Sequence, residues 1–229
     1  MKSLLSIIFL VTSIISCIKI ISTKSTSSAL IPFLMVLGIG IVLDLIEELK
    51  RYKNDRLTNN TKTKVYSNKK FRNIVWSKIN VGNLIKIKKD EMIPADLFVL
   101  CTSNKDGSFY LQTASLDGES NLKQREVLMD IQKIFYKQKI KDENKLEKIF
   151  QGINDEGEEN CYIEVEQPNK NIYEIYGNIV LNKNEKNHFE ARNTAIRGAL
   201  LKNTNYIYGI VIYTGNDTKI MKNFIKYKN

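Results

Sequence analysis

Two apolar stretches near the N-terminal end constrain this chain more than any other feature. Residues 4–21 contain one charged side chain, Lys19, and residues 29–46 contain one, Asp44. Each stretch is close to the roughly 20 residues that a helix needs to cross the hydrocarbon core of a bilayer. The polar link between them, residues 22–28, is short enough for two antiparallel spans. The pattern therefore predicts an α-helical membrane hairpin.

Basic residues follow the second stretch directly and indicate its orientation. They are Lys50, Arg51, Lys53 and Arg56. Because lysine and arginine gather on the cytosolic side of membrane spans, we expect everything after Lys50 to be cytosolic. The chain is then an integral, multi-pass membrane protein whose large domain faces the cytosol. We expect residues 47–54 to continue the second span as a charged stalk helix.

Two other interpretations of the apolar stretches stay open. Lys2 precedes the first stretch, as in a signal peptide, but no small-x-small cleavage site follows it. Either stretch could instead be a buried core helix. Two stretches in tandem, the second followed by a basic cluster, favour the membrane hairpin over both alternatives.

The net charge of +10 suits either nucleic acid or an anionic membrane surface as a neighbour. No helix-turn-helix, zinc-finger or RNP-like pattern is present, so we expect no nucleic-acid partner. The three cysteines, Cys17, Cys101 and Cys161, lie far apart, and His188 is the single histidine. None of these residues has the spacing of a zinc site, so we expect no metal site.

The rest of the chain is typical of a small β-rich domain with a helical insert. After a polar linker at residues 57–63, short apolar runs separated by Gly82, Pro94 and Asp106-Gly107 predict strands. The predicted strands are residues 74–76, 84–87, 97–100, 109–111, 162–166 and 171–176, with a hairpin-like pair at 195–201 and 206–213. Helical spacing of apolar residues predicts helices over 121–150 and 217–227. The fold class is therefore α+β, a membrane hairpin joined to a distorted β-rich domain.

Residues 113–123 contain the best candidate for chemistry. The run Thr-Ala-Ser-Leu-Asp-Gly-Glu-Ser-Asn-Leu-Lys predicts a strand that ends in a tight turn at Asp117 and Gly118, with Glu119 at an exposed tip and a helix after it. A carboxylate on a projecting loop can orient and deprotonate a water molecule if a partner supplies an electrophile. Taken alone, the run is more typical of a solvated turn than of a catalytic loop.

Other motifs accompany this run in a fixed order. They are Arg51-Tyr52-Lys53-Asn54-Asp55, Pro94-Ala95-Asp96-Leu97, Glu166-Gln167-Pro168-Asn169, Asn193-Thr194-Ala195-Ile196-Arg197-Gly198, Leu201-Lys202-Asn203-Thr204 and Tyr213-Thr214-Gly215-Asn216-Asp217-Thr218-Lys219. Together they resemble the phospholipid-translocating (flippase) branch of the P-type ATPases, over the first two membrane spans and the actuator domain. The Glu-x-Pro-Asn insert resembles flippases more than cation pumps.

The resemblance implies a role for each residue of the loop. The family's actuator domain rotates against a phosphorylated aspartate on another domain, and its loop carboxylate positions the water that hydrolyses this covalent intermediate. Glu119 would take that role, Asp117 and Gly118 would shape the loop, and Ser120 and Asn121 would support it. Ser120 replaces the usual threonine but keeps the hydroxyl. In the first span Ser16 and Lys19 replace the Gln and Pro of many flippases, which leaves headgroup choice open.

The resemblance also sets the expected boundaries and partners. We expect a transmembrane hairpin and stalk at residues 1–56, an actuator domain at 57–221 and the start of a further stalk at 222–229. The parent enzyme would use ATP and Mg²⁺, a membrane phospholipid, its own phosphorylation and nucleotide domains and an accessory membrane subunit. The 229 residues contain no Asp-Lys-Thr-Gly-Thr phosphorylation motif, so we expect this segment to bind neither cofactor and to be inactive alone.

Three functions therefore stay open. The first is the N-terminal fragment of an ATP-driven flippase, whose actuator domain promotes dephosphorylation and couples it to lipid transport. The second is a non-catalytic, membrane-anchored module that keeps the actuator fold for binding. The third is a segment of a cation-transporting P-type ATPase.

Overall fold

The computed structural model of the chain forms two compact units, Met1–Thr58 and Asn59–Asn229, and each is described by itself. The described residues are 26–67, 70–114, 118–137, 162–172, 174–182 and 185–225. The first predicted span, residues 4–21, lies outside them.

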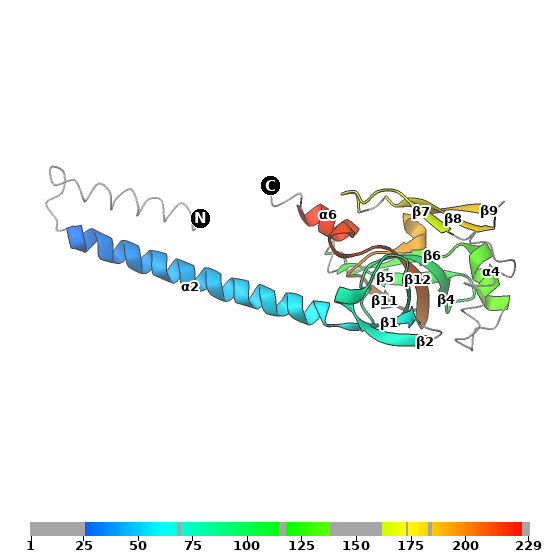
Figure 1. Cartoon of the computed structure of the whole chain (residues 1–229), viewed down its shortest axis with the longest axis horizontal. Coiled ribbons are helices and arrows are strands. Elements are labelled where there is room, and N and C mark those ends of the chain that lie inside the picture. The colour runs from blue at the N-terminus through cyan, green and yellow to red at the C-terminus, as the bar shows by residue number, and fades with distance from the viewer. Residues whose placement is uncertain are drawn as a thin grey trace. The chain divides into compact units, whose positions relative to one another are not determined.

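The first unit contains one described helix, α2, which runs from Thr26 to Asn59 (Figure 1). It includes the predicted stalk, where Arg51 pairs with Glu47 at 2.8 Å and with Glu48 at 3.3 Å. The helix also enters the predicted linker, because β1 begins at Lys62 and only Asn60 and Thr61 separate the two elements. Across the described residues we find no helix whose apolar length would cross a membrane.

A six-stranded antiparallel sheet forms the largest part of the second unit. Its spatial order is β10-β4-β12-β3-β1-β2. The strands are β1 (Lys62–Ser67), β2 (Lys70–Val75), β3 (Leu84–Lys88), β4 (Asp96–Thr102), β10 (Thr194–Ala195) and β12 (Tyr206–Tyr213). The predicted strands at 84–87 and 97–100 are confirmed as β3 and β4. Their side chains are mostly buried, which explains the nearly unbroken apolar runs.

Two three-stranded antiparallel sheets complete the unit, in the orders β11-β5-β6 and β7-β8-β9. The strands are β5 (Ser108–Gln112), β6 (Leu122–Glu126), β7 (Tyr162–Val165), β8 (Tyr176–Asn182), β9 (Glu185–Glu190) and β11 (Leu200–Lys202). The helices are η1 (Trp76–Lys78), α4 (Met129–Lys137), η3 (Ala191–Asn193), η4 (Gly215–Asp217) and α6 (Lys219–Ile225).

The core joins the sheets through large apolar side chains. The rings of Phe98 on β4 and Phe189 on β9 are fully buried with centroids 4.3 Å apart. Helix α4 is tied to β4 by the buried amide of Gln132, which accepts a hydrogen bond from the Thr102 N–H at 3.1 Å and donates to the Asn104 carbonyl at 2.9 Å. The β-rich domain predicted from the sequence is therefore present.

Three predictions of local structure are wrong. Residues 122–126 form β6 rather than the start of a helix, because they pair along their whole length with β5. Residues 171, 172, 174 and 175, the described residues before Tyr176, form no strand, and β8 begins only at Tyr176. The pair 195–201 and 206–213 is no hairpin, because β11 pairs with β5 whereas β12 lies between β3 and β4.

Candidate functional site

The predicted reactive run forms the loop between two paired strands. Strands β5 and β6 are antiparallel, with Gln112 opposite Leu122 at the loop end. Gly118 has φ of 76°, in the left-handed region that glycine tolerates best, and its N–H donates to the Ala114 carbonyl at 3.1 Å. The chain therefore turns sharply at Gly118, as the sequence predicts. Asp117 lies outside the described residues.

Glu119 follows Gly118 directly in the described part of this loop. Its side chain is 62% exposed, and its carboxylate lies 3.2 Å from the ammonium group of Lys123 on β6. An ion pair this exposed contributes little stability, on the order of 0–1 kcal/mol, although it limits where the carboxylate points. Ser120 and Asn121 beside it are also exposed. The loop thus presents a carboxylate and a hydroxyl to any surface that approaches it.

The scaffold under this loop is braced by a distant segment of the chain. Strand β11 pairs with β5 on the side opposite β6, with Leu201 facing Leu111. Beyond β11, the buried hydroxyl of Thr204 accepts a hydrogen bond from the Tyr110 N–H at 3.2 Å. The motif that contains Leu201 and Thr204 therefore acts by holding the strand that leads to Glu119.

A second cluster forms around Lys219, the first residue of α6. Its side chain is fully buried, and its ammonium donates to the Glu166 carboxylate at 2.8 Å, the Asn169 side-chain oxygen at 2.7 Å and the Glu174 carbonyl at 2.6 Å. All three protons of the ammonium are thereby used. The Tyr213 hydroxyl donates to the Glu166 carbonyl at 2.6 Å and fixes the same loop from β12.

The Asp96 carboxylate binds the backbone of the same lysine instead of its side chain. One carboxylate oxygen accepts the Lys219 N–H at 2.7 Å, and the other accepts the Arg197 N–H at 2.8 Å. Burial raises the pKa of Asp96 from 3.8 to about 6, although both hydrogen bonds favour the charged form. Residues from four separate motifs of the sequence therefore meet at Lys219.

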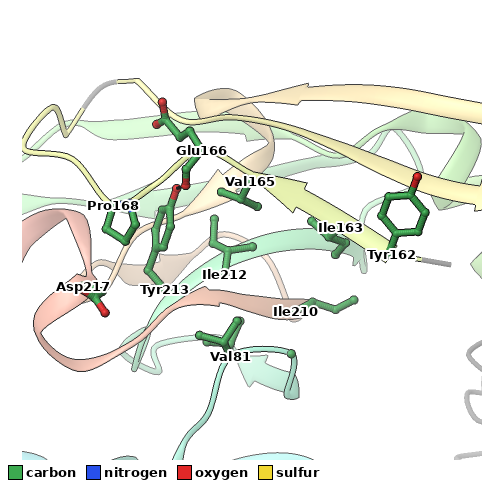
Figure 2. A pocket seen from close by; sticks show the side chains of 12 residues that line it. Val81, Tyr162, Ile163, Val165, Glu166, Pro168, Ile210, Ile212, Tyr213 and Asp217 are labelled. Carbon is green, nitrogen blue, oxygen red and sulfur yellow. Dashed lines mark hydrogen bonds between the residues drawn. The ribbon is translucent and has the colours of Figure 1, made fainter.

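A pocket of about 550 Å³ borders this cluster (Figure 2). Its floor is formed by Ile210 and Ile212 of β12, and Ile163 and Val165 of β7 line it from the other side. Both acidic side chains in its lining are paired, Glu166 with Lys219 and Asp217 with Lys222 at 2.9 Å. We therefore assign no catalytic role to the pocket.

Sequence reasoning gave Glu119 a role but none to Asp96, Lys219 or Thr204. All three lie in the motifs named above, but only Asp96, a carboxylate at the start of the apolar strand β4, carried a signal in the sequence that could have found it. In the described part of the chain, no group of three His, Cys, Asp or Glu side chains could hold a metal ion.

Comparison with known proteins places these features in a family. Residues 57–224 match the family described as the P-type ATPase actuator domain. The chain is 36% identical over 215 residues to phospholipid-transporting ATPase IC of Xenopus tropicalis, covering 94% of this chain and 16% of that protein. It is 34% identical over 216 residues to phospholipid-transporting ATPase 10 of Arabidopsis thaliana, covering 94% of this chain and 17% of that protein. The chain thus spans about a sixth of the length of these relatives.

Proposed function

This chain belongs to the P-type ATPase family through its actuator domain at residues 57–224, and we propose that it is the actuator-bearing part of an ATP-driven phospholipid flippase. The relatives named above are phospholipid-transporting ATPases, and they support this substrate class over inorganic cations. The actuator domain would promote dephosphorylation of an aspartyl-phosphate intermediate and couple that step to lipid movement.

The observation that carries the proposal is the placement of Glu119. The carboxylate is exposed, yet the loop that holds it is fixed between β5 and β6, and β5 is braced in turn by β11. General-base catalysis needs a carboxylate that a second surface can reach and a scaffold that defines its position. The loop between β5 and β6 meets both requirements.

In the proposed reaction Glu119 orients a water molecule beside the phosphoryl group of the partner domain. The carboxylate accepts a proton as the water oxygen bonds to phosphorus, and the bond from phosphorus to the aspartate oxygen breaks. Gly118 supplies the sharp turn that projects Glu119, and Ser120 with Asn121 supports the loop. Asp117 is proposed to shape the same loop.

The membrane part of the proposal rests on the two apolar stretches. We propose that residues 1–56 form a transmembrane hairpin and stalk, that the actuator domain covers 57–221 and that 222–229 begin a further stalk. The side chains of Leu34, Ile39, Ile41 and Leu45 on α2 are all more than half exposed, which suits a lipid environment. In this proposal ATP and Mg²⁺ bind the phosphorylation and nucleotide domains of the longer protein, and an accessory membrane subunit acts with it.

The test is the Glu119→Gln substitution in a flippase relative whose corresponding region is replaced by residues 1–229. Glutamine keeps the size of the side chain but removes the proton acceptor. Phosphoenzyme formation should persist, while its hydrolysis should slow by roughly 10²–10⁴-fold, so that the phosphoenzyme accumulates and lipid transport stops.

A matched control is Glu126→Gln at the end of β6, the strand that follows the Glu119 loop. The Glu126 side chain is 54% exposed and pairs with Arg192 at 3.2 Å, much as Glu119 pairs with Lys123. This control should hydrolyse its phosphoenzyme at the normal rate. Equal rates in the two variants would reduce Glu119 to a solvated turn residue, and a chimera that never forms a phosphoenzyme would favour a binding module.

A further inference from the structure

The positive charge of this chain is concentrated in one short segment. Residues 60–89 contain nine basic and no acidic residues, which gives +9 against a net charge of +10 for the whole chain. The stalk just before this segment has no net charge. Between residues 44 and 56 its acidic residues are Asp44, Glu47, Glu48 and Asp55, and its basic residues are Lys50, Arg51, Lys53 and Arg56. The lysines are spread along the chain, but the uncompensated charge is local.

The fold gathers this segment into one end of the six-stranded sheet. Strands β3, β1 and β2 are the last three in the sheet order, and β2 is its edge. Their basic residues, with those directly following β2 and β3, form what we call the basic sheet end. The described members are Lys62, Lys64, Lys70, Arg72, Lys78, Lys86, Lys88 and Lys89.

Pairing within the sheet brings like charges together instead of separating them. Lys64 on β1 lies directly opposite Lys86 on β3. Like charges at opposed positions of an antiparallel pair destabilise the sheet, so this arrangement is a cost that the folded domain carries. A partner that supplied negative charge at this surface would remove that cost.

Among the described residues no ion pair joins a carboxylate to the basic sheet end. Two carboxylates lie beside it: Asp90, whose pKa is lowered by Lys202 and by the charge of Lys89, and Glu91, which accepts the Lys88 N–H at 2.8 Å. Lysines elsewhere in the same unit behave differently, since Lys133 pairs with Asp130 at 3.3 Å and Lys186 with Glu164 at 2.8 Å. The ammonium of Lys86 lies instead over aromatic rings, 5.3 Å from the Tyr206 centroid and 5.1 Å from that of Tyr208. The local potential therefore stays positive.

Aromatic rings share the face that Lys64 and Lys86 occupy. Tyr66 lies opposite Phe71, and the half-buried Tyr206 lies opposite Lys88. The rings of Tyr66 and Phe71 contact each other with centroids 5.2 Å apart, and both side chains are half-buried. Half-buried tyrosines among lysines are typical of surfaces that meet the membrane–water interface. Rings packed against each other offer few open faces for stacking nucleic-acid bases.

The connection to α2 restricts what this surface can meet. Residues 47–59 of the helix extend roughly 20 Å beyond the second apolar stretch, at 1.5 Å per residue. The two residues before β1 add roughly 10 Å at most. If the helix is anchored as proposed above, at most roughly 30 Å of chain separates the second apolar stretch from the start of β1.

We propose that the basic sheet end docks on anionic phospholipid headgroups of the membrane that anchors this chain. The proposal rests on the membrane anchor of the proposed function but not on the role of Glu119. The contact is electrostatic and acts over about 8 Å at physiological salt, so high salt weakens it.

The test measures the reactivity of single lysines in the full chain. The chain is reconstituted in nanodiscs of phosphatidylcholine alone or mixed with phosphatidylserine, and amine labelling is read for each lysine by mass spectrometry. Labelling of Lys62, Lys64 and Lys88, which share one face of the sheet, should slow roughly threefold or more with phosphatidylserine, and high salt should restore it. Lys133 and Lys186, which are exposed on other elements, should label equally in both lipids and act as internal controls.

Two charge variants complete the test. Replacing Lys62, Lys64, Lys70 and Lys88 by glutamine should abolish the protection of Lys89 by phosphatidylserine. Replacing Lys105, Lys133, Lys170 and Lys186 by glutamine, which changes the net charge equally, should leave it intact. Equal labelling of the basic sheet end in the two lipids overturns the proposal. It is also overturned if soluble RNA or polyglutamate protects these lysines from labelling and phosphatidylserine does not. Failure of the chain to stay in either nanodisc would instead count against the membrane anchor.

Discussion

Asp96 and Lys219 are 123 positions apart in sequence and joined by a 2.7 Å hydrogen bond from the backbone N–H of the lysine to the carboxylate of the aspartate. The side chain of the same lysine is fixed to the 166–174 segment. One residue of α6 is therefore held through both its backbone and its side chain. This double attachment links the start of β4, the Glu-x-Pro-Asn segment and the exit helix of the domain.

Replacing Lys219 by methionine should destabilise the domain by about 3 kcal/mol. The change removes a fully buried charge and leaves the Glu166 carboxylate and two further acceptors without their donor. Urea unfolding followed by the fluorescence of Trp76, the single tryptophan, measures the change. Lys222→Met on the same helix is the control, and loss of its more exposed pair with Asp217 should cost less than about 1 kcal/mol. Similar costs for the two variants would contradict the buried network.

Asp96 should make the domain less stable as the pH rises. Because its pKa is about 6 in the folded protein and 3.8 in the reference state, the folded protein binds the proton more tightly. Tighter proton binding by the folded state adds about 3 kcal/mol to the free energy of unfolding. This stabilisation is fully present below pH 3.8 and is lost as the pH rises through about 6. Asp96→Asn lacks this titration, so the stability of the wild type relative to the variant should fall between pH 4 and pH 7. A flat or rising difference in urea unfolding would show that the carboxyl is charged throughout.

Thr204→Val should loosen the strand that leads to Glu119. Valine keeps the shape of threonine but removes the oxygen that accepts the Tyr110 N–H, and an unsatisfied donor in a buried setting costs about 1–3 kcal/mol. Hydrogen exchange of the Tyr110 amide should accelerate in this variant. Thr204→Ser keeps the hydroxyl and should exchange at nearly the wild-type rate. Equal protection in the valine and serine variants would remove Thr204 from the bracing of β5.

Gly177→Ala should destabilise the packing between β8 and its neighbours. An added Cβ would collide with the ring of Phe189 and would lie 2.6 Å from the Glu164 carbonyl oxygen. Overpacking of this kind costs about 1–3 kcal/mol, and the backbone contact cannot be relieved by a side-chain rotation. Gly40→Ala is the control, because a Cβ at that helical position meets nothing within 4 Å. An unfolding midpoint shared by Gly177→Ala and Gly40→Ala would show that β8 shifts freely.

The sequence predicts the buried strands of this domain well and its pairing poorly. A continuous apolar run locates β4, and the apolar residues around Lys86 locate β3, because both strands have interior positions that only apolar side chains tolerate. The same reasoning fails for β6, whose residues Leu-Lys-Gln-Arg-Glu all favour helices. Pairing with β5 overrides that preference, and a single sequence contains no local sign of it.

The sequence likewise predicts one part of the candidate site and not the other. The position of Glu119 at a turn follows from Asp-Gly, since Gly118 adopts the left-handed conformation that this dipeptide favours. The meeting of Asp96, Glu166 and Lys219 could not be predicted from spacing, because the pairs are joined across 53 and 123 positions. The resemblance to a family identifies the motifs that contain these residues and their order along the chain. Their contact in space is visible only in the folded domain.

The central place of β12 has a consequence for the synthesis of this protein. The neighbours of β12 in the sheet, β3 and β4, are complete at Thr102, but the strand that lies between them begins only at Tyr206. At 5–20 residues per second, a ribosome needs roughly 5–20 s to make the intervening segment. During that interval the inner edges of β3 and β4 have hydrogen-bonding groups with no native partner. Slow translation between these two positions should therefore lengthen the exposure of the nascent chain to chaperones and to aggregation more than an equal pause near Asn229.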